Sequence, residues 1–590
     1  MAESLDPNIL ARAKAWAANP AFNDASRAEI QKLIDSEDNK EIKERFYKDL
    51  EFGTGGMRAI LGQGTNRLNK YNIWKATHAL SLAVLEKKPS GAKVAISYDS
   101  RRFSFEFAKE AATVFAANGI KALLYKQLNP VALCSFAIRH HGCQAGVMVT
   151  ASHNPPEYNG YKVFWADGAQ VTPPQDGIII NNFNSITDYS KIPTCDFDQA
   201  MKEGKIQWLG EETEGLYYEA IKGKSLRLKE TTAHGQEVKI AYTALHGTGW
   251  HTCSRALNDL GLTNIVTVAE QKEPDGSFPT VSSPNPENPE ALAMVVELMK
   301  KESADIALGT DPDTDRVGVA LYEDSKVHYL NGNQIGILML HYILSTHKEM
   351  GSMPKNPYFV KTIVTTDLQN KIAESYGVQG EDTLTGFKWI CGLMNDIETN
   401  SPERSFVFAT EESFGYLNHE YVRDKDGVSS IALMGEITLY YKRKGLNLLQ
   451  ALDNIYEEYG FSHESLVSIN YYGIEGAEKI KRIMEKFREW DTTPICGQEI
   501  AILSDYKSLK TRDDIEGVTK PLPFAHASNV LGFKFKNGNK LFLRPSGTEP
   551  KIKFYIMITE NEGSLSEKKE KAKALSEKIV TFVKEKSEEA

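Results

Sequence analysis

Three aspartates stand at alternate positions in the segment GTDPDTDR. Asp311, Asp313 and Asp315 come directly after the apolar run IALGT, which predicts a buried strand. Carboxylates this close repel one another, and a cation relieves that cost; all-oxygen ligands suit Mg²⁺ or Ca²⁺. An EF-hand loop requires Gly at its sixth position and Glu at its twelfth, where this chain has Arg316 and Tyr322. The segment therefore predicts a site for a hard cation that is not an EF-hand.

A hydroxyl and an imidazole follow a second apolar strand, in the segment VMVTASHNPPEYNG. Ser152 and His153 come just past the strand, and Asn154-Pro155-Pro156 then imposes a rigid, non-helical loop. The segment is not a nucleophile elbow, because that turn requires GxSxG. Such a loop can hold the hydroxyl toward solvent or toward a metal ion. The aspartate segment in the same chain strengthens the functional interpretation.

Two neighbouring segments carry groups that can bind a sugar. In TEESFGY, Glu411 and Ser413 can bind vicinal hydroxyls, since a carboxylate accepts hydrogen bonds and a hydroxyl both donates and accepts. The segment RDKDG follows closely and adds Arg423 and Lys425. Standing alone, these residues would fit a charged surface turn equally well.

A basic segment near the end of the chain, RPSGTEPKIKFY, has the groups of a phosphate cradle. Arg544 can bind an anion with two hydrogen bonds, Ser546 and Thr548 offer hydroxyls, and Gly547 allows backbone N–H groups to approach. It is not a P-loop, because GxxxxGK[ST] is absent from the sequence. A Gly-rich segment, FGTGGMRAILG, presents Arg58 and lacks the GxGxxG of a dinucleotide site.

The composition is that of a globular protein of several domains, with 590 residues, 41% hydrophobic and 25% charged. The formal net charge of −10 argues against binding of nucleic acid or an anionic membrane, so positive charge for an anionic substrate must be gathered locally. Six scattered cysteines without a CxxC pair favour the reducing cytoplasm. The sequence begins without the pattern of a secretory signal, and no apolar run approaches the roughly 18 residues that cross a bilayer.

Strands and helices alternate along most of the chain, which predicts α/β layers with mostly parallel strands. Residues 93–99 predict a buried strand and residues 103–118 the helix after it. Three apolar strands, within residues 147–152, 306–311 and 406–411, end in a Thr that is followed by a residue capable of chemistry. This repeat predicts three related α/β domains. Each would present one loop at the carboxyl end of an equivalent strand, where ligands bind in open α/β sheets.

The remaining segments predict a different domain and a stiff loop. In the last part of the chain, Asn537-Gly538 marks a hairpin, and separated helices indicate a smaller α+β domain. The Pro-rich segment PDGSFPTVSSPNPENP, residues 274–289, predicts a stiff loop inside a domain. A helix is expected to follow it, with Asn288 as N-cap and Pro289 at the first helical position.

The chain resembles the α-D-phosphohexomutase superfamily of phosphoglucomutases and phosphomannomutases in four segments, which occur in the same order as that family's motifs: TASHNP, DPDTDR, EESFGY and RPSGTEP. The resemblance covers residues 53–553. GFKWI and SPNPE make the chain more similar to the longer branch, which includes phosphoglucomutases, phosphopentomutases and sugar-bisphosphate synthases. The family implies an α/β fold of three related α/β domains with mixed sheets, plus a smaller C-terminal α+β domain, around a central cleft. The expected domains are 1–205 with the phosphoserine loop, 206–325 with the metal loop, 326–460 with the sugar-binding loop and 461–590 with the phosphate-binding loop.

The resemblance also implies a role for each matching residue. The phosphoserine is expected at Ser152, and Lys425 matches a position of general acid/base catalysis. The expected catalytic residues are Ser152, Lys425, Arg58, Lys162, His153 and Arg316. The expected Mg²⁺ ligands are Ser152, Asp311, Asp313 and Asp315. The expected substrate-binding residues are Glu411, Ser413, Lys388, Arg423, Arg544, Ser546, Gly547, Thr548 and Lys553. The family often has Ser in GTSGLR where this chain has Gly55, so any contribution of that serine is absent.

The resemblance implies a phosphoglucomutase-type reaction that interconverts sugar 1-phosphate and sugar 6-phosphate. Glucose is the expected sugar, mannose is possible, and glucose 1,6-bisphosphate is the expected intermediate and activator. The alternatives are a phosphopentomutase, a glucose-1,6-bisphosphate synthase, a metal-dependent phosphatase and a non-catalytic binding relative. We expect a cytoplasmic monomer or homodimer whose partner is a small phosphosugar, with no nucleic-acid or membrane partner.

Overall fold

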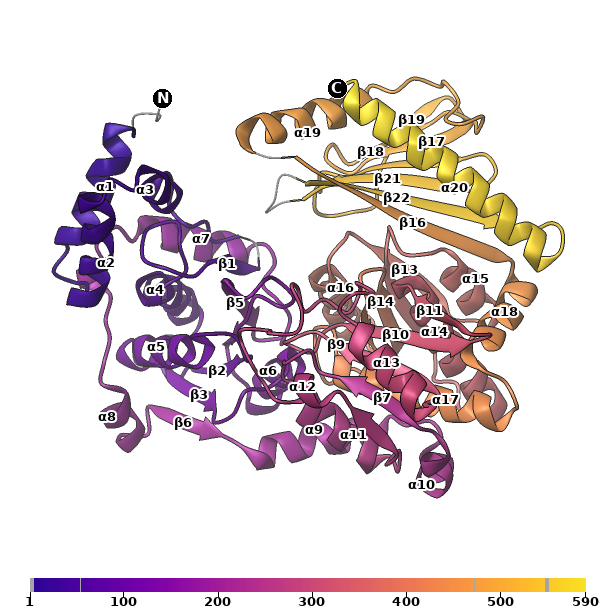
Figure 1. The fold of residues 1–590 in the computed structure, drawn as a ribbon, viewed down its shortest axis with the longest axis horizontal. Helices are drawn as coiled ribbons and strands as arrows, with labels where there is room; N and C mark the ends of the chain where they lie inside the picture. The colour runs from indigo at the N-terminus through magenta and orange to yellow at the C-terminus, as the bar shows by residue number, and fades with distance from the viewer. Residues whose placement is uncertain (1–4, 54, 472, 547–550) are drawn as a thin grey trace. The chain divides into compact units, whose positions relative to one another are not determined.

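The computed structural model describes residues 5–53, 55–471, 473–546 and 551–590 (Figure 1). Its contacts divide the chain into two compact units. The first unit consists of Met1–Gly332, Phe387–Ala409 and Ser413–Lys444, and the second of Asn333–Gly386, Thr410–Glu412 and Gly445–Ala590. The chain therefore passes from one unit to the other several times.

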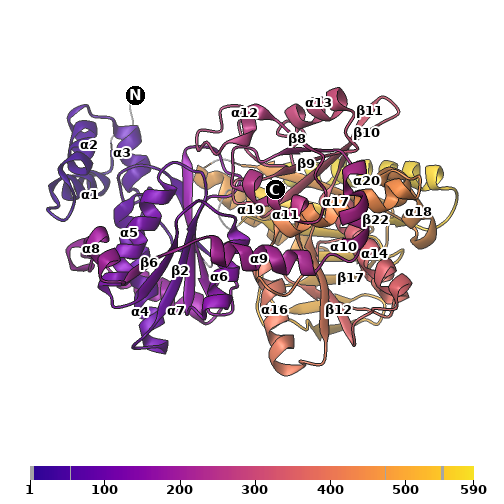
Figure 2. The same cartoon turned by 90° about the horizontal axis from the view of Figure 1, so that it is seen from below.

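A six-stranded mixed sheet forms the centre of the first part of the first unit (Figures 1 and 2). Its strands lie in the order β1-β5-β4-β2-β3-β6; β2 pairs in parallel with β3 and β4, β6 in parallel with β3, and β5 antiparallel with β4 and β1. The bounds are β1 Gly56–Ile60, β2 Lys93–Tyr98, β3 Lys121–Tyr125, β4 Ala145–Val149, β5 Tyr158–Trp165 and β6 Ile206–Leu209. The crossover from β2 to β3 contains α5 (Ser104–Ala117), and the crossover from β3 past β2 to β4 contains α6 (Val131–His141). The two crossovers run in opposite directions across the sheet, so right-handed connections place the two helices on opposite faces. The predicted strand at 93–99 and helix at 103–118 are confirmed.

A five-stranded mixed sheet follows in the same unit, in the order β11-β10-β9-β7-β8. Here β7 pairs in parallel with β8 and β9, and β10 pairs antiparallel with β9 and β11. The bounds are β7 Ile240–Thr243, β8 Ile265–Thr267, β9 Ile306–Thr310, β10 Val317–Glu323 and β11 Lys326–Leu330. The helices that pack on this sheet include α13 (Ala293–Glu302) and α17 (Gly427–Arg443), and α17 also packs against α11 (Gly249–Asp259).

A four-stranded sheet has the order β13-β12-β14-β15. Its bounds are β12 Pro357–Thr362, β13 Gln379–Thr383, β14 Ser405–Glu411 and β15 Gly415–Leu417, and the helices of this region are α14 Gly332–Met350, α15 Leu368–Ser375 and α16 Phe387–Asn400. The division between the compact units falls within β14, after Ala409. This part of the chain therefore contributes to both units.

The three sheets share one strand order, which is β3-β2-β4-β5 in the first, β8-β7-β9-β10 in the second and β13-β12-β14-β15 in the third. The strands β4, β9 and β14 occupy the same place in this order. They are also the three strands that the sequence pattern singled out. The predicted three-fold repeat of α/β domains with mixed sheets is confirmed by this shared topology.

The carboxyl-terminal part of the second unit is built on an antiparallel sheet of seven strands, ordered β16-β22-β21-β20-β17-β18-β19. The bounds are β16 Phe461–Asn470, β17 Ile500–Asp505, β18 Lys510–Asp513, β19 Val518–Pro521, β20 Leu531–Phe535, β21 Lys540–Pro545 and β22 Lys551–Glu560. The predicted hairpin joins β20 to β21, and Gly538 takes the left-handed φ of 91° that its turn requires. The helices α19 (Gly473–Arg488) and α20 (Leu565–Glu588) pack on the sheet, with α20 lying along it in Figure 1. The predicted α+β domain is confirmed.

Three helices at the start of the described chain, α1 (Pro7–Ala18), α2 (Asp24–Asp35) and α3 (Asn39–Phe46), form a group beside the first sheet (Figure 2). Trp16, Phe22 and Phe46 form an aromatic cluster with Tyr71 of α4 (Lys70–Lys87). The other α-helices are α7 Gln175–Ser185, α8 Phe197–Lys202, α9 Glu211–Gly223, α10 Leu228–His234, α12 Ala269–Lys272 and α18 Leu448–Tyr459. Among the described residues, no helix is long and apolar enough to cross a membrane.

The helix after the Pro-rich segment begins later than the sequence predicts. The expected start was Pro289 with Asn288 as its N-cap, whereas α13 begins at Ala293. The N–H groups of Leu292 and Ala293 donate to the carbonyls of Pro289 and Glu290, three residues back. Tight turns of this kind use the 3₁₀ bond pattern, so the α-helical pattern starts only after them. Residues 274–289 do form a loop, as predicted.

Candidate active site

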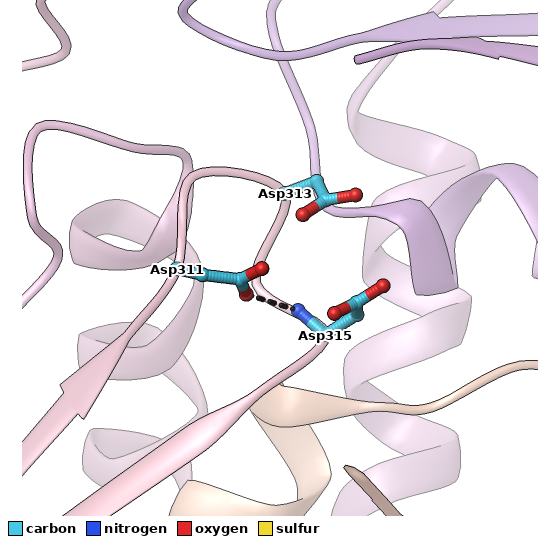
Figure 3. A group of neighbouring side chains, drawn as sticks. All are labelled: Asp311, Asp313 and Asp315. Carbon is cyan, nitrogen blue, oxygen red and sulfur yellow. Dashed lines mark hydrogen bonds between the residues drawn. The ribbon is translucent and has the colours of Figure 1, made fainter. Parts of the chain in front are cut away.

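The three aspartates lie on the turn between β9 and β10, where the second sheet presents a loop at the carboxyl end of its equivalent strand. The side chains of Asp311, Asp313 and Asp315 are all buried, and one oxygen of each lies within 4.8 Å of the others. Figure 3 shows the three carboxylates gathered around the same space. Asp311 Oδ1 accepts hydrogen bonds from the backbone N–H groups of Asp315, at 2.9 Å, and Arg316, at 3.0 Å. The turn is thereby closed by its own first carboxylate.

The polar atoms of this turn fit a metal ion. Asp313 Oδ1 and Asp315 Oδ1 are buried and have no hydrogen-bond partner among the described residues. A buried carboxylate oxygen without a partner is costly, and a bound cation removes that cost. Burial, together with the charges of Asp315 and Asp313, raises the pKa of Asp311 well above its ordinary value. The aspartate turn can therefore bind a metal ion, and its all-oxygen ligand set suits a hard cation.

Two lysines from distant segments meet the aspartate turn. Lys162 of β5 places Nζ 2.6 Å from Asp313 Oδ2 and 3.1 Å from Asp315 Oδ2. Lys425 places Nζ 3.4 Å from Asp315 Oδ2 and 3.1 Å from Asp424 Oδ1. Burial lowers the pKa of Lys162, but the charges of Asp313 and Asp315 outweigh it and raise that pKa above its ordinary value. Burial likewise raises the pKa of Asp315, yet the two lysines hold it below its ordinary value. Both groups are therefore charged at neutral pH.

The hydroxyl of Ser152 reaches the aspartate turn from the loop after β4. Its Oγ donates to Asp311 Oδ2 at 2.7 Å and lies 3.2 Å from His153 Nδ1. Ser152 is buried and has a φ of 51°, a left-handed conformation that is uncommon for a non-glycine residue. Its backbone N–H donates to Thr150 Oγ1 at 2.8 Å. A strained backbone held by local hydrogen bonds thus presents the hydroxyl beside the candidate metal site.

The imidazole of His153 is neutral in this setting. Burial, and then the positive charges of Arg316 and Arg58, lower the pKa of His153 well below its ordinary value. A neutral imidazole carries one ring nitrogen that can accept a proton, and Nδ1 is the ring nitrogen near Ser152 Oγ. His153 is therefore placed beside the serine as predicted.

Two arginines predicted at the site are also in this region. Arg58 Nη1 donates to Asn154 Oδ1 in the serine loop at 2.9 Å. Arg316 forms an ion pair with Glu287, which comes from the Pro-rich segment. Arg58 therefore contacts the Ser152 loop directly, and Arg316, in the aspartate segment, contacts the Pro-rich segment.

The loop that carries Lys425 is fixed by a buried network at the start of α17. Asp426 is the N-cap of this helix and accepts from the backbone N–H of Ser429 at 3.0 Å. Its carboxylate also accepts from Tyr217 Oη at 2.8 Å and is bonded to His419 Nε2 at 2.8 Å. The network holds the residue next to Lys425 in place. Removal of one member would leave a buried carboxylate short of a donor.

Arg423 has a different environment from the one its predicted substrate role would suggest. Its Nε donates to Asn395 Oδ1 at 2.8 Å, and its Nη2 donates to Glu398 Oε2 at 2.6 Å. Its Nη1 donates to the backbone carbonyls of Glu420 and, at 3.1 Å, Val422. These contacts occupy every nitrogen of the guanidinium and join the loop to α16. A direct contact with substrate would require some of them to be exchanged.

The predicted sugar-binding residues lie at and after the end of β14. Glu411 is the last residue of this strand, and Ser413 follows two positions later. In the second unit, Glu412 Oε2 accepts from Thr362 Oγ1 at 3.1 Å and Thr365 Oγ1 at 3.3 Å. Lys388 lies near the start of α16, where burial, partly offset by the charge of Asp176, lowers its pKa.

The predicted phosphate-binding segment lies in the second unit and includes the end of β21 and the start of β22. Arg544 stands opposite Lys553 in the antiparallel register of these two strands. The backbone N–H of Ser546 donates to the carbonyl of Lys551 at 2.7 Å, which adds one bond to the pairing of the two strands. Gly547 and Thr548 lie outside the described residues. Two cations directly opposite each other repel, and an anion between them would relieve that repulsion.

Several residues of this region were missed by the sequence analysis. Asp424 and Asp426 flank the predicted Lys425, and their acidic type in RDKDG was the available signal. Glu287 lies in the Pro-rich segment, which was interpreted as a stiff loop and as a similarity to the longer branch of the family, without a role for Glu287. Asp99 and Arg101 follow the first buried strand, and the carboxyl end of that strand was the signal that would have found them.

Comparison with known proteins agrees with this fold. Family profiles match three parts of the chain: phosphoglucomutase/phosphomannomutase, alpha/beta/alpha domain I over residues 49–190, domain II over residues 216–323 and domain III over residues 331–459. A phosphoglucomutase of Staphylococcus saprophyticus is 35% identical over 90% of this chain and 94% of its own. A human phosphopentomutase is 32% identical over 94% of this chain and 92% of its own. The structure of parafusin, a phosphoglucomutase from Paramecium in an open form, superposes with a TM-score of 0.67 at 18% identity, over 92% of this chain and 96% of its own.

The chain belongs to the phosphoglucomutase/phosphomannomutase family, within the α-D-phosphohexomutase superfamily. Enzymes of this family are isomerases that act as intramolecular phosphotransferases.

Proposed function

We propose that the protein is a phosphoglucomutase-type enzyme that interconverts sugar 1-phosphate and sugar 6-phosphate, with glucose phosphates as the preferred substrates. The observation that carries the proposal is the 2.7 Å contact between Ser152 Oγ and Asp311 Oδ2, in a cluster that two lysines also enter. A hydroxyl at this place can carry a phosphoryl group beside a cation site. The names of the relatives, phosphoglucomutase among them, support the same class of substrate.

The proposed reaction has two transfers at Ser152. In the first, a sugar hydroxyl oxygen bonds to phosphorus while the bond from phosphorus to Ser152 Oγ breaks, which leaves a sugar bisphosphate. This intermediate, which is glucose 1,6-bisphosphate when the sugar is glucose, then reorients in the site so that its other phosphoryl group faces Ser152. In the second transfer, Ser152 Oγ bonds to the other phosphoryl group and the sugar oxygen is released. Each cycle begins and ends with a phosphoryl group on Ser152, so no inorganic phosphate is released.

The residues of the chain have separate roles in this cycle. Asp311, Asp313 and Asp315 would hold Mg²⁺ together with Ser152, and that ion would neutralise charge on the transferring group. Phosphoryl transfer depends chiefly on positioning and on charge neutralisation. We propose that Lys162 contributes to charge neutralisation, because it enters the same cluster and is charged.

Proton transfer and substrate binding complete the proposal. We propose that Lys425 accepts the proton of the attacking sugar hydroxyl. We propose that Arg58, His153 and Arg316 surround the phosphoryl group on Ser152. We propose that Glu411, Ser413 and Lys388 bind the sugar. Arg423 would also contact the substrate only after exchanging some of its present contacts. The non-reacting phosphate is assigned to Arg544, Ser546, Gly547, Thr548 and Lys553.

The test is an isomerisation assay with Mg²⁺ and a trace of glucose 1,6-bisphosphate, in which ³¹P NMR follows glucose 1-phosphate, glucose 6-phosphate and inorganic phosphate. We expect glucose 6-phosphate to form without another phosphate donor and without release of phosphate. Ser152→Ala should abolish the reaction, while the exposed Ser190→Ala should retain it. Formation only with an added donor would indicate a bisphosphate synthase, and phosphate release would indicate a phosphatase; either result contradicts the proposal.

A phosphopentomutase is the second candidate, because a relative named phosphopentomutase matches nearly the whole chain at 32% identity. Values of kcat/KM for glucose 1-phosphate, mannose 1-phosphate and ribose 1-phosphate, measured on one preparation, decide between the sugars. We expect glucose 1-phosphate to give the highest value. A higher value for ribose 1-phosphate would assign the pentose reaction to the same Ser152 centre.

A further inference from the structure

Arg101 is a buried arginine that the proposed function does not use. It lies three residues after β2, and its guanidinium points into the loop that carries Ser152. Its Nη2 donates to the carbonyl of Ser152 at 2.5 Å and to the carbonyl of Asn154. Its Nη1 donates to the carbonyls of Pro155 and Tyr158, each at 3.0 Å. One guanidinium therefore binds four backbone carbonyls spread along the serine loop.

The other edge of the serine loop is bound to the same strand end through Asp99. The carboxylate Oδ2 of Asp99 accepts from Thr150 Oγ1 at 2.6 Å, and Thr150 Oγ1 accepts from the backbone N–H of Ser152 at 2.8 Å. Asp99 Oδ1 accepts from the backbone N–H of Arg101 at 2.9 Å. The carbonyl of Ser152 is thus bound directly by Arg101, and its N–H is bound by Thr150, which Asp99 binds in turn. This dual attachment accounts for the left-handed φ of 51° at Ser152, a conformation that must be held by its surroundings.

The Pro-rich segment, residues 274–289, covers this arrangement. The ring of Phe278 lies 4.9 Å from the guanidinium carbon of Arg101, a cation–π distance. Ser283 Oγ donates to the carbonyl of His153 at 2.8 Å. A Cβ at Gly276 would lie 2.5 Å from the backbone nitrogen of Arg102, so only glycine permits this close approach. The segment therefore shields Arg101 from water and adds a bond to the carbonyl next to Ser152.

These contacts determine where the serine hydroxyl points. Rotation of the backbone at Ser152 would move Oγ away from Asp311 Oδ2, which it now meets at 2.7 Å. Without the guanidinium, each of the four carbonyls would lose one donor, although the carbonyl of Pro155 would keep its bond from the N–H of Tyr158. The loop would then be free to relax from its left-handed turn. A displacement of about 1 Å at a reacting group can lower a rate by about 100-fold.

We propose that Arg101 is a positioning residue for phosphoryl transfer. It holds the carbonyls on the C-terminal side of Ser152, so that Oγ stays directed at the aspartate turn. This inference rests on the proposed function, in which Ser152 carries the phosphoryl group. Arg101 makes no contact with the reacting atoms in this account and acts through the backbone of the loop.

The test compares Arg101→Met and Arg101→Lys with Arg102→Met. Arg102 is the matched control, because it is exposed and donates a single bond, at 3.0 Å, to the carbonyl of Pro156. We expect kcat of Arg101→Met to fall about 100-fold while KM stays within about threefold of the wild type. The kcat of Arg101→Lys should lie between those of the wild type and Arg101→Met, because a lysine keeps the charge but cannot reproduce the planar fork that binds several acceptors. Arg102→Met should remain within about twofold of the wild type.

Hydrogen exchange of the amides in residues 152–160 provides a readout that does not depend on turnover. Faster exchange there in Arg101→Met, with unchanged exchange in Arg102→Met, is the expected result. If Arg101→Met does not fold, Arg101→Lys supplies the same two measurements. Unchanged kcat together with unchanged loop exchange in a folded Arg101 variant overturns the inference. A change in KM with unchanged kcat also overturns it. Failure of the proposed function would show separately, as absence of mutase activity in the wild type, and hydrogen exchange would then decide the positioning role by itself.

Discussion

Two charged regions of the chain are built in different ways. In the first unit, the centre around Ser152 and the aspartate turn brings opposite charges into contact, with Lys162 Nζ 2.6 Å from Asp313. In the second unit, the antiparallel register of β21 and β22 places two like charges, Arg544 and Lys553, opposite each other. A centre in which opposite charges touch is stabilised by its own contacts, whereas two cations opposite each other in a strand register can both contact an anion that binds there. We therefore expect the first region to determine kcat and the second to determine KM.

Loss of one aspartate should have the largest effect. Asp313→Ala removes one ligand of the candidate metal site and one partner of Lys162, and we expect activity with Mg²⁺ to fall by about 10³-fold or more. Circular dichroism should show an intact fold. The control is Asp324→Ala, which changes an exposed aspartate at the turn between β10 and β11. Wild-type activity in Asp313→Ala would remove the metal site from the account.

The next largest effect is expected at Lys162. Lys162→Met removes a charge that two buried carboxylates share, and we expect kcat to fall about 100-fold with little change in KM. Lys191→Met, at a lysine whose side chain is 83% exposed, should behave as the wild type. A rise in KM with unchanged kcat would show instead that Lys162 binds substrate in its ground state, and the contrast between the two regions would disappear.

Arg544 provides the test in the second unit. Arg544→Ala should raise KM by about 10- to 100-fold and change kcat only a few-fold, since a hydrogen bond to a charged group contributes about 1.5–3 kcal/mol. Lys536→Ala, in the hairpin of the same sheet, is the matched control and should leave KM unchanged. An unchanged KM in Arg544→Ala would mean that the non-reacting phosphate is bound elsewhere.

The smallest expected effect concerns the stability of the second unit at low pH. Asp367 Oδ1 lies 3.2 Å from Lys361 Nζ, and its other oxygen pairs with Lys540. Burial raises the pKa of Asp367, but Lys361 and Lys540 outweigh it and lower that pKa from 3.8 to about 2. A depressed folded-state pKa stabilises the fold above the unfolded value, and this stabilisation is lost as the pH falls from about 4 toward about 2.

The size of this effect follows from exposure. The side chain of Asp367 is 41% exposed, so solvent screening reduces the contribution to about 1 kcal/mol or less. Urea unfolding of the wild type and Asp367→Asn should therefore differ by about this amount at pH 5, with a smaller difference at pH 3. Asp324→Asn serves as the control. A difference that grows on acidification would contradict the assigned sign.

Much of the fold could be predicted because local pattern and topology agree. The strands before Ser152, Asp311 and Glu411 are short apolar runs that end in polar residues, and the three sheets place them equivalently. The start of α13 could not be predicted in the same way. Pro289 and Asn288 suit a helix start, but successive tight turns at Pro289 and Glu290 satisfy the backbone first.

The candidate site was predicted less completely than the fold, because its supporting contacts join residues far apart in sequence. Asp99 and Arg101 hold a loop more than 50 positions away, and no short motif marks such a pair. Arg423 was predicted to bind substrate from its neighbours in RDKDG, yet its guanidinium is taken up by contacts with α16 and its own loop. Residue type alone does not reveal which charges are already paired inside the fold.

Mass analysis of Ser152 tests the central claim most directly. The purified protein would be incubated with glucose 1,6-bisphosphate, digested, and analysed for the peptide that contains Ser152. We predict one added phosphoryl group on Ser152. If it comes from ¹⁸O-labelled glucose 1,6-bisphosphate, unlabelled glucose 1-phosphate or glucose 6-phosphate should then replace it with an unlabelled group, because each cycle returns the substrate's own phosphoryl group to Ser152. Phosphate found only on other residues, or a labelled Ser152 phosphate that substrate does not exchange, would contradict the proposed cycle.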